Sequence, residues 1–169
     1  MIKPNNKYRA LNYLMTTGLG RCLFAGIWFA AAGFIPVAYY LLRFGDGLPI
    51  LGGSIALTAL IPTFISGFMG LVLGSNILYP EETKTEFKAI GLGFSVAALS
   101  FFLLFVVPAI LTFSVSGDIF GTVAAFAIFF LYGLMMVGWL AAIVGAAAGG
   151  LLYLFRLKTM KRFDESRQL

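Results

Sequence analysis

Long runs without a charged residue alternate along the chain with short polar segments. The charge-free runs cover residues 22–42, 47–80, 89–117 and 119–155. A helix rises 1.5 Å per residue and needs about 20 residues to cross a hydrocarbon layer of about 30 Å, so each run is long enough. The runs lack the polar and apolar alternation of membrane β-barrel strands. The pattern therefore predicts four membrane-spanning helices, with approximate bounds 22–43, 48–79, 88–113 and 119–155.

Turn-forming residues separate these runs. Glycine, proline or serine occurs in the segments 45–49 and 114–118, and Tyr79 is followed by a proline and two glutamates. The length of 169 residues fits one domain. We therefore expect an all-α polytopic membrane protein, with residues 1–169 forming a single transmembrane domain.

The fourth run is longer than a bilayer requires. Residues 119–155 as one straight helix would extend about 55 Å, so this segment must tilt, protrude, bend, or begin after an interfacial stretch near 119–125. The N-terminal residues 7–19 also have two interpretations. They form either a short interfacial helix, with apolar residues at helical spacing, or an irregular basic tail.

The basic residues indicate an orientation. Lysine and arginine accumulate on the cytoplasmic side of membrane proteins. With the N-terminus inside, 11 of the 12 basic residues fall on that side, and Arg43 is the exception. Both termini are therefore expected on the cytoplasmic or equivalent side. Basic residues near the ends of spans one and four are candidates for docking lipid headgroups or a partner: Lys3, Lys7, Arg9, Arg21, Arg156, Lys158, Lys161 and Arg162.

Small residues recur at steps of three or four in the second and fourth spans. The second span contains Gly52, Ala56, Ala59, Thr63, Gly67, Gly70 and Gly74, and the fourth contains Gly138, Ala142, Gly145 and Gly149. Such spacing lets the backbones of membrane helices approach closely. Because spans two and four run in the same direction, we expect them to pack against each other at their cytoplasmic ends. Contact with another subunit, or with a flat ligand such as a pigment or quinone, is the alternative.

Composition excludes several kinds of chemistry. The chain is 60% hydrophobic and 11% charged, has no histidine and contains a single cysteine, Cys22. Metal sites built on histidine or on several cysteines are therefore excluded, as is an intramolecular disulfide. The predicted spans have charged residues only at an end, Arg43 and Lys88, and none in their interior, which disfavours proton-coupled transport and voltage sensing. Serine nucleophiles have no histidine to activate them, so we expect no catalytic residue, metal or cofactor.

Two functions remain. The first is a small non-catalytic accessory or scaffold subunit of a larger membrane complex, of the energy-transducing or translocation type, with lipid, quinone or pigment contact. Its partners would be membrane lipids and other membrane subunits, and no nucleic acid. The alternative is a homo-oligomeric channel or carrier for a small uncharged solute. Its candidate pore-lining residues are Ser54, Thr58, Thr63, Ser66 and Asn76.

Overall fold

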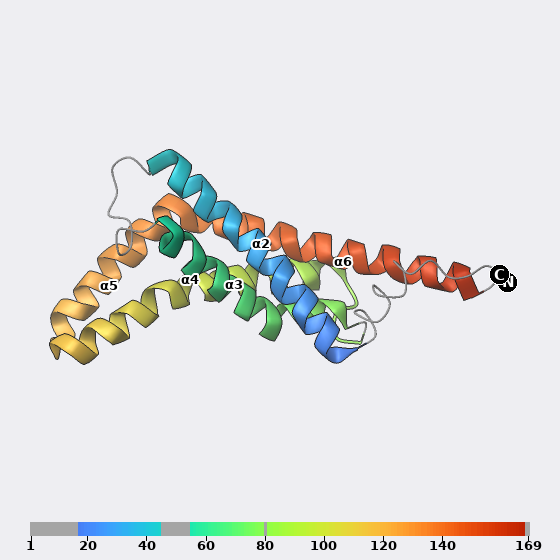
Figure 1. The fold of residues 1–169 in the computed structure, drawn as a ribbon, viewed down its shortest axis with the longest axis horizontal. Coiled ribbons are helices and arrows are strands. Elements are labelled where there is room, and N and C mark those ends of the chain that lie inside the picture. Colours follow the sequence, from blue (N-terminus) through green and yellow to red (C-terminus); the bar gives the residue numbers. More distant parts are fainter. Residues whose placement is uncertain (1–16, 45–54, 80, 168–169) are drawn as a thin grey trace.

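The computed structural model describes residues 17–44, 55–79 and 81–167, with side chains at 17–43, 59–79, 81–115 and 117–161. Every element in these ranges is a helix (Figure 1). Three segments are long and apolar enough to cross a membrane: Gly18–Arg43, Glu86–Val115 and Ile119–Lys161. A shorter apolar helix covers Ala59–Val72, within the predicted second span, whose first residues lie outside the described ranges.

In chain order the helices are α2 (Gly18–Phe44), α3 (Ile55–Val72), the 3-10 turn η2 (Gly74–Leu78), α4 (Glu86–Ser116), α5 (Ile119–Gly133), the π-helical turn η3 (Leu134–Gly138) and α6 (Trp139–Arg167). Helix α4 is capped at both ends by its local sequence. The Thr85 hydroxyl caps α4 by accepting from the Lys88 amide at 3.3 Å. Gly117 ends α4 with a φ of 67°, and its amide donates to the Phe113 carbonyl at 2.8 Å.

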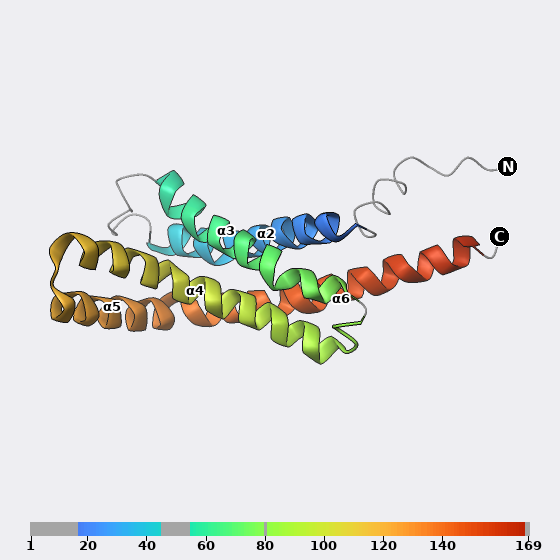
Figure 2. The same cartoon turned by 90° about the horizontal axis from the view of Figure 1, so that it is seen from below.

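The turn between α4 and α5 is tight. Gly117 supplies the left-handed conformation, and the next residue, Asp118, caps α5 by accepting from the Gly121 amide at 3.0 Å. The two helices therefore form an antiparallel hairpin. In both views this hairpin extends beyond the neighbouring ends of α2 and α3 (Figures 1 and 2).

The long fourth segment is bent. Figure 1 shows α5 and α6 meeting at an angle, and η3 lies at their junction. A π-helical turn interrupts the regular hydrogen-bond ladder and is a common cause of such bends. Of the arrangements expected for residues 119–155, the bend is therefore present. The far end of α6 projects from the other helices (Figure 2).

The helices form two closely packed pairs, α2 with α3 and α4 with α6, which also touch through α2 and α6 and through α3 and α4. The second and fourth spans were expected to pack against each other at their cytoplasmic ends. Contact between them is concentrated at η2, the last part of the second span, which touches α6, whereas α3 packs mainly on α2 and α6 mainly on α4. The expectation therefore holds for η2 but not for α3. A stripe of small residues allows close approach to any suitable backbone and does not specify the partner helix.

The buried core lies toward the end of the bundle at which α2 and α4 begin. It contains Ala25, Phe29, Ile77, Leu78, Ala89, Val96, Ala148, Leu152 and Tyr153. The opposite half is formed largely by the α4–α5 hairpin, and α5 has no buried residue. Close packing is thus concentrated in one half of the molecule.

Candidate functional site

The glycines of α3 lie against α2. A Cβ added at Gly67 would come within 3.3 Å of the Gly26 carbonyl oxygen, and one at Gly70 within 2.9 Å of the Ala25 carbonyl oxygen. At Gly74 the obstacle is the ring of Phe29, which is 1% exposed. Gly67 and Gly70 therefore let the α2 and α3 backbones approach each other, and Gly74, in η2, leaves room for the Phe29 ring.

The glycines of α6 lie against α4. A Cβ added at Gly145 would be 2.8 Å from the Gly93 carbonyl oxygen, and one at Gly149 would be 2.9 Å from the Gly93 Cα. Since real Cβ atoms essentially never come so close to backbone, larger residues would force the helices apart. Glycines of both α4 and α6 therefore form the contact between these two helices.

The remaining stripe residues have varied surroundings. Ala59 and Ala142 are half-buried, and the Thr63 hydroxyl donates to the Ala59 carbonyl of its own helix at 2.8 Å. Gly138 is buried in η3, where an added Cβ would be 2.8 Å from Leu134 Cδ1. Gly52 and the Ala56 side chain lie outside the described residues.

Complementary stripes of small residues, not among the predicted packing residues, are present on the first and third spans. On the first span they are Gly26, Ala30 and Gly33, and on the third they are Ala89, Gly93 and Ala97. Both sets recur at steps of three or four, the same signal used for spans two and four. Stripes on all four spans indicate that each helix can make a close contact, but they do not indicate which helices pair.

A buried arginine ties α6 to the segment between α3 and α4. Arg156 is 5% exposed. Its Nη1 donates to the carbonyls of Ile77 at 2.6 Å and Tyr79 at 3.4 Å, and its Nη2 donates to the Thr83 carbonyl at 3.0 Å. Cationic donors suit carbonyls at the end of a helix, where the backbone dipole is negative. Its Nε is buried with no acceptor among the described residues.

Further bonds hold the same segment, residues 73–85, which we call the α3–α4 turn. Tyr153, one helical turn before Arg156, donates its hydroxyl to the Lys84 carbonyl at 3.1 Å. Thr83 is fully buried and donates its hydroxyl to the Asn76 carbonyl at 2.9 Å. Side chains of α6 therefore donate to the carbonyls of Ile77, Thr83 and Lys84. The Tyr79 carbonyl also accepts from the backbone amides of Glu82 and Thr83.

Aromatic rings accompany the two arginines at this end. The Arg156 guanidinium carbon lies 4.8 Å from the centroid of the Tyr153 ring. From α2, the Arg21 guanidinium carbon lies 4.7 Å from the centroid of the Tyr79 ring. Both distances are typical of cation–π contact. The two arginines thus approach Tyr79 from different helices, one at its ring and one at its carbonyl.

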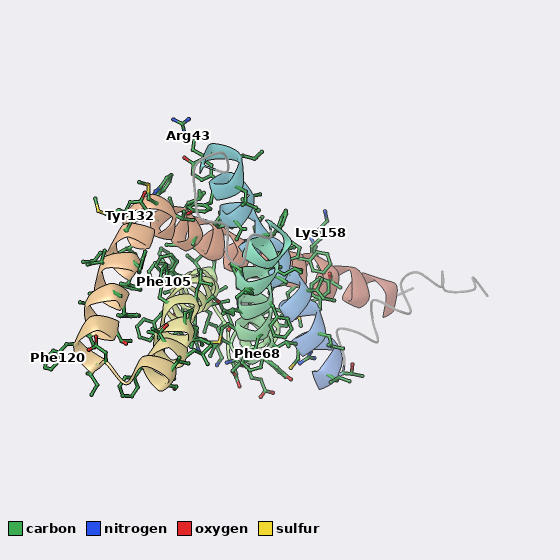
Figure 3. All side chains as sticks on the ribbon, turned by 60° about the vertical axis from the view of Figure 1, so that its left-hand side comes forward. Arg43, Phe68, Phe105, Phe120, Tyr132 and Lys158 are labelled. Atoms are coloured by element: carbon green, nitrogen blue, oxygen red, sulfur yellow. The ribbon has the colours of Figure 1, made fainter. Side chains whose placement is uncertain are left out.

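The predicted docking residues differ in how exposed their side chains are. Lys158 and Lys161 are exposed beyond the bundle, and Figure 3 shows Lys158 directed outward. Arg21 is half-buried, whereas Arg156 is directed into the protein. The others lie outside the description: Lys3, Lys7, Arg9 and the side chain of Arg162. The interfacial helix considered for residues 7–19 also falls mainly outside the described ranges.

Two polar side chains bond between helices in the packed half. The Trp28 indole donates to the Ala148 carbonyl at 3.0 Å, which links α2 to α6. The Ser66 hydroxyl donates to the Phe29 carbonyl at 2.8 Å, which links α3 to α2. Of the candidate pore residues, Ser66 and Thr63 therefore use their hydroxyls on helix carbonyls. Ser54 and the Thr58 side chain are not described, and Asn76 is half-buried.

Phenylalanines hold the α4–α5 hairpin together. Phe101 and Phe105 of α4 have ring centroids 5.7 Å from that of Phe130 on α5. Edge and tilted pairs at such distances are favourable. Phe105 lies between the two helices in Figure 3, whereas Phe120 points outward and is 90% exposed. Apart from these inward rings, the hairpin presents apolar side chains to its surroundings.

An open apolar groove of about 240 Å³ runs between α4 and α5. Phe102, Val106, Thr122 and Phe126 are among its lining residues. Within the described ranges, no cluster of three or more cysteine or acidic residues could hold a metal ion. The arrangement offers hydrogen bonds and charge at the α3–α4 turn and apolar contact along the hairpin.

Comparison with protein-family models, curated proteins and solved structures found no match to the chain.

Proposed function

We propose that the protein crosses a membrane four times, with both termini on the cytoplasmic or equivalent side. Three long apolar helices and the apolar helix Ala59–Val72 support four crossings. The charge-free run at 47–80 gives the second crossing sufficient length. The orientation is supported by the accumulation of basic residues at the termini, with Lys84 and Lys88 on the same expected side.

Single cysteines test this topology. Cys22→Ala gives a chain without cysteine, because Cys22 is its only one. A cysteine is then introduced at Gly117, in the α4–α5 turn, or at exposed Lys161 near the end of α6. A membrane-impermeant maleimide applied to intact cells should label the first variant, and should label the second only after permeabilisation. The opposite pattern would reverse the orientation, and labelling of both in intact cells would exclude the topology.

The protein then serves as a non-catalytic accessory or scaffold subunit of a larger membrane complex. The observation that carries this proposal is the absence of any buried residue on α5, in a hairpin that extends beyond α2 and α3. An apolar helix surface gains no hydrophobic free energy by leaving lipid for protein. Membrane helices therefore associate through complementary shape and close van der Waals contact. Because α5 packs mainly on α4 and has no buried residue, most of its surface is available to another subunit.

Photocrosslinking distinguishes subunit contact from lipid contact. A photoreactive amino acid replaces Phe129 on α5, whose side chain is 64% exposed, or Phe64 on α3, which is 77% exposed and serves as the matched control. In native membranes we expect Phe129→photoprobe to crosslink to an unlike protein and the control to crosslink chiefly to lipid. Lipid adducts alone at both positions would oppose the scaffold proposal. A crosslink between two copies of this chain would favour the homo-oligomeric alternative.

A further inference from the structure

Two leucines and two lysines share one exposed face of α6. Leu151, Leu154, Lys158 and Lys161 follow one another at steps of three, four and three, the spacing that places residues on one side of a helix. All four are exposed, and the two leucine side chains are 56% and 49% exposed. The leucines come first, and the lysines follow toward the end of α6 that projects from the other helices (Figure 2). We call these four residues the α6 face.

The lysines lie just beyond the level at which the bundle ends. Arg156 donates to the Thr83 carbonyl, so it is level with the α3–α4 turn, where the charge-free run of the second span ends at residue 80. Because a helix rises about 1.5 Å per residue, Lys158 and Lys161 follow Arg156 by about 3 Å and about 7.5 Å along the axis. The headgroup layer on each side of a bilayer is roughly 5–7 Å thick. In a membrane, the lysines would therefore reach the headgroups, and the leucines would face the acyl chains.

The positive charge of the α6 face is available to an external anion. Within the described ranges, neither Lys158 nor Lys161 takes part in a hydrogen bond or an ion pair. Each ammonium group offers three donors and no acceptor. From residue 158 to residue 167 the sequence contains four basic and two acidic residues, so this end of α6 has a net positive charge.

The other exposed lysines on the same expected side have different surroundings. Residues 81–88 contain two lysines but three glutamates, so that segment has a net negative charge. Lys88 also donates its ammonium group to the Glu82 carbonyl. An anion should therefore prefer the α6 face to this segment.

We propose that the α6 face binds an anionic phospholipid of the adjoining leaflet, with the phosphate at Lys158 and Lys161 and an acyl chain along Leu151 and Leu154. The order of apolar and then basic residues along the helix matches the order of chain and phosphate in one lipid molecule. Free phosphate or an acidic protein would need the lysines but not the leucines beside them. This inference rests on the membrane insertion proposed above, and it depends on neither the orientation nor the scaffold role.

Lipid retention in native mass spectrometry tests the proposal. The protein is purified in detergent and equilibrated with phosphatidylglycerol or phosphatidylcholine of equal chain length. The test variant carries Lys158→Gln and Lys161→Gln. The matched control carries Lys84→Gln and Lys88→Gln, which remove the same charge from exposed positions on the same expected side. Both pairs of substitutions leave the buried Arg156 and its bonds in place.

Wild-type protein and the control should retain phosphatidylglycerol in preference to phosphatidylcholine. The Lys158 and Lys161 variant should lose about 30-fold in phosphatidylglycerol affinity, as expected for two basic residues at the headgroups. Equal retention by the two variants would overturn the site.

Two other ligands would also be recognised. Displacement of the lipid by millimolar inorganic phosphate would show a free-phosphate site and overturn the proposal. Unchanged lipid retention together with loss of a co-purifying acidic protein would assign the lysines to a protein partner and overturn it as well. A chain that stays in solution without detergent would instead refute the membrane insertion on which the proposal rests.

Discussion

Substitution of Gly93 by alanine should separate α4 from α6. The added Cβ would lie 2.8 Å from the Gly149 Cα and also too close to the Gly145 carbonyl oxygen, where ordinary contact begins at 3.4 Å. Both obstacles are backbone atoms, so the helices must move apart by roughly half an ångström or more. A gap of this size removes about a quarter of the dispersion energy across the contact. We expect a loss of about 2–3 kcal/mol in the free energy of unfolding, at the upper part of the range for overpacking.

Gly91→Ala is the matched control, two residues earlier on the same helix. No atom lies within 4 Å of a Cβ added there. Both variants gain the same helix propensity of alanine over glycine, so their difference isolates the contact with α6. Unfolding by increasing SDS in mixed micelles, followed by tryptophan fluorescence, should show an equilibrium constant shifted about 30-fold or more between the two. Identical unfolding curves would refute the close backbone packing of α4 on α6.

Two further substitutions test hydrogen bonds between segments. Arg156→Gln should lower the free energy of unfolding by about 3 kcal/mol, because three carbonyls of the α3–α4 turn lose a charged donor. Lys158→Gln, at an exposed position of the same helix, should change it by less than about 0.5 kcal/mol, and equal thermal melts for the two variants would contradict the role of Arg156. Trp28→Phe should cost about 1 kcal/mol through the lost bond to the Ala148 carbonyl. Trp139→Phe, at a side chain 52% exposed, should cost less in the same assay, and the reverse order would argue against the bond.

The apolar pattern was sufficient to predict helices of membrane length, because hydrocarbon leaves the backbone few other ways to satisfy its polar groups. The charge-free run at 119–155 also required a bend or an equivalent adjustment. Its place was not predictable, because no proline marks it and the π-helical turn Leu134–Gly138 has an ordinary apolar sequence. By contrast, Pro36, Pro62 and Pro108 lie inside α2, α3 and α4, which continue past them.

The partner of each helix was harder to predict than its length. Small residues on α3 and α6 show where backbones can approach, but small residues on both α2 and α4 leave two possible partners for each. Arg156 posed a different problem. A basic residue just beyond a predicted span usually faces headgroups, and only the folded α3–α4 turn brings unsatisfied carbonyls within its reach. Its role therefore depends on contacts between residues more than seventy positions apart in the chain.

Native-mass measurement of the protein purified from its own membranes tests the central claim most directly. If the protein is a scaffold subunit that binds other subunits through its exposed α4–α5 hairpin, it should be recovered with unlike membrane subunits in a fixed stoichiometry. Substitution of exposed Phe129 by a charged residue should release it from them. A closed assembly of identical chains, or a monomer accompanied by lipid alone, would contradict the scaffold account.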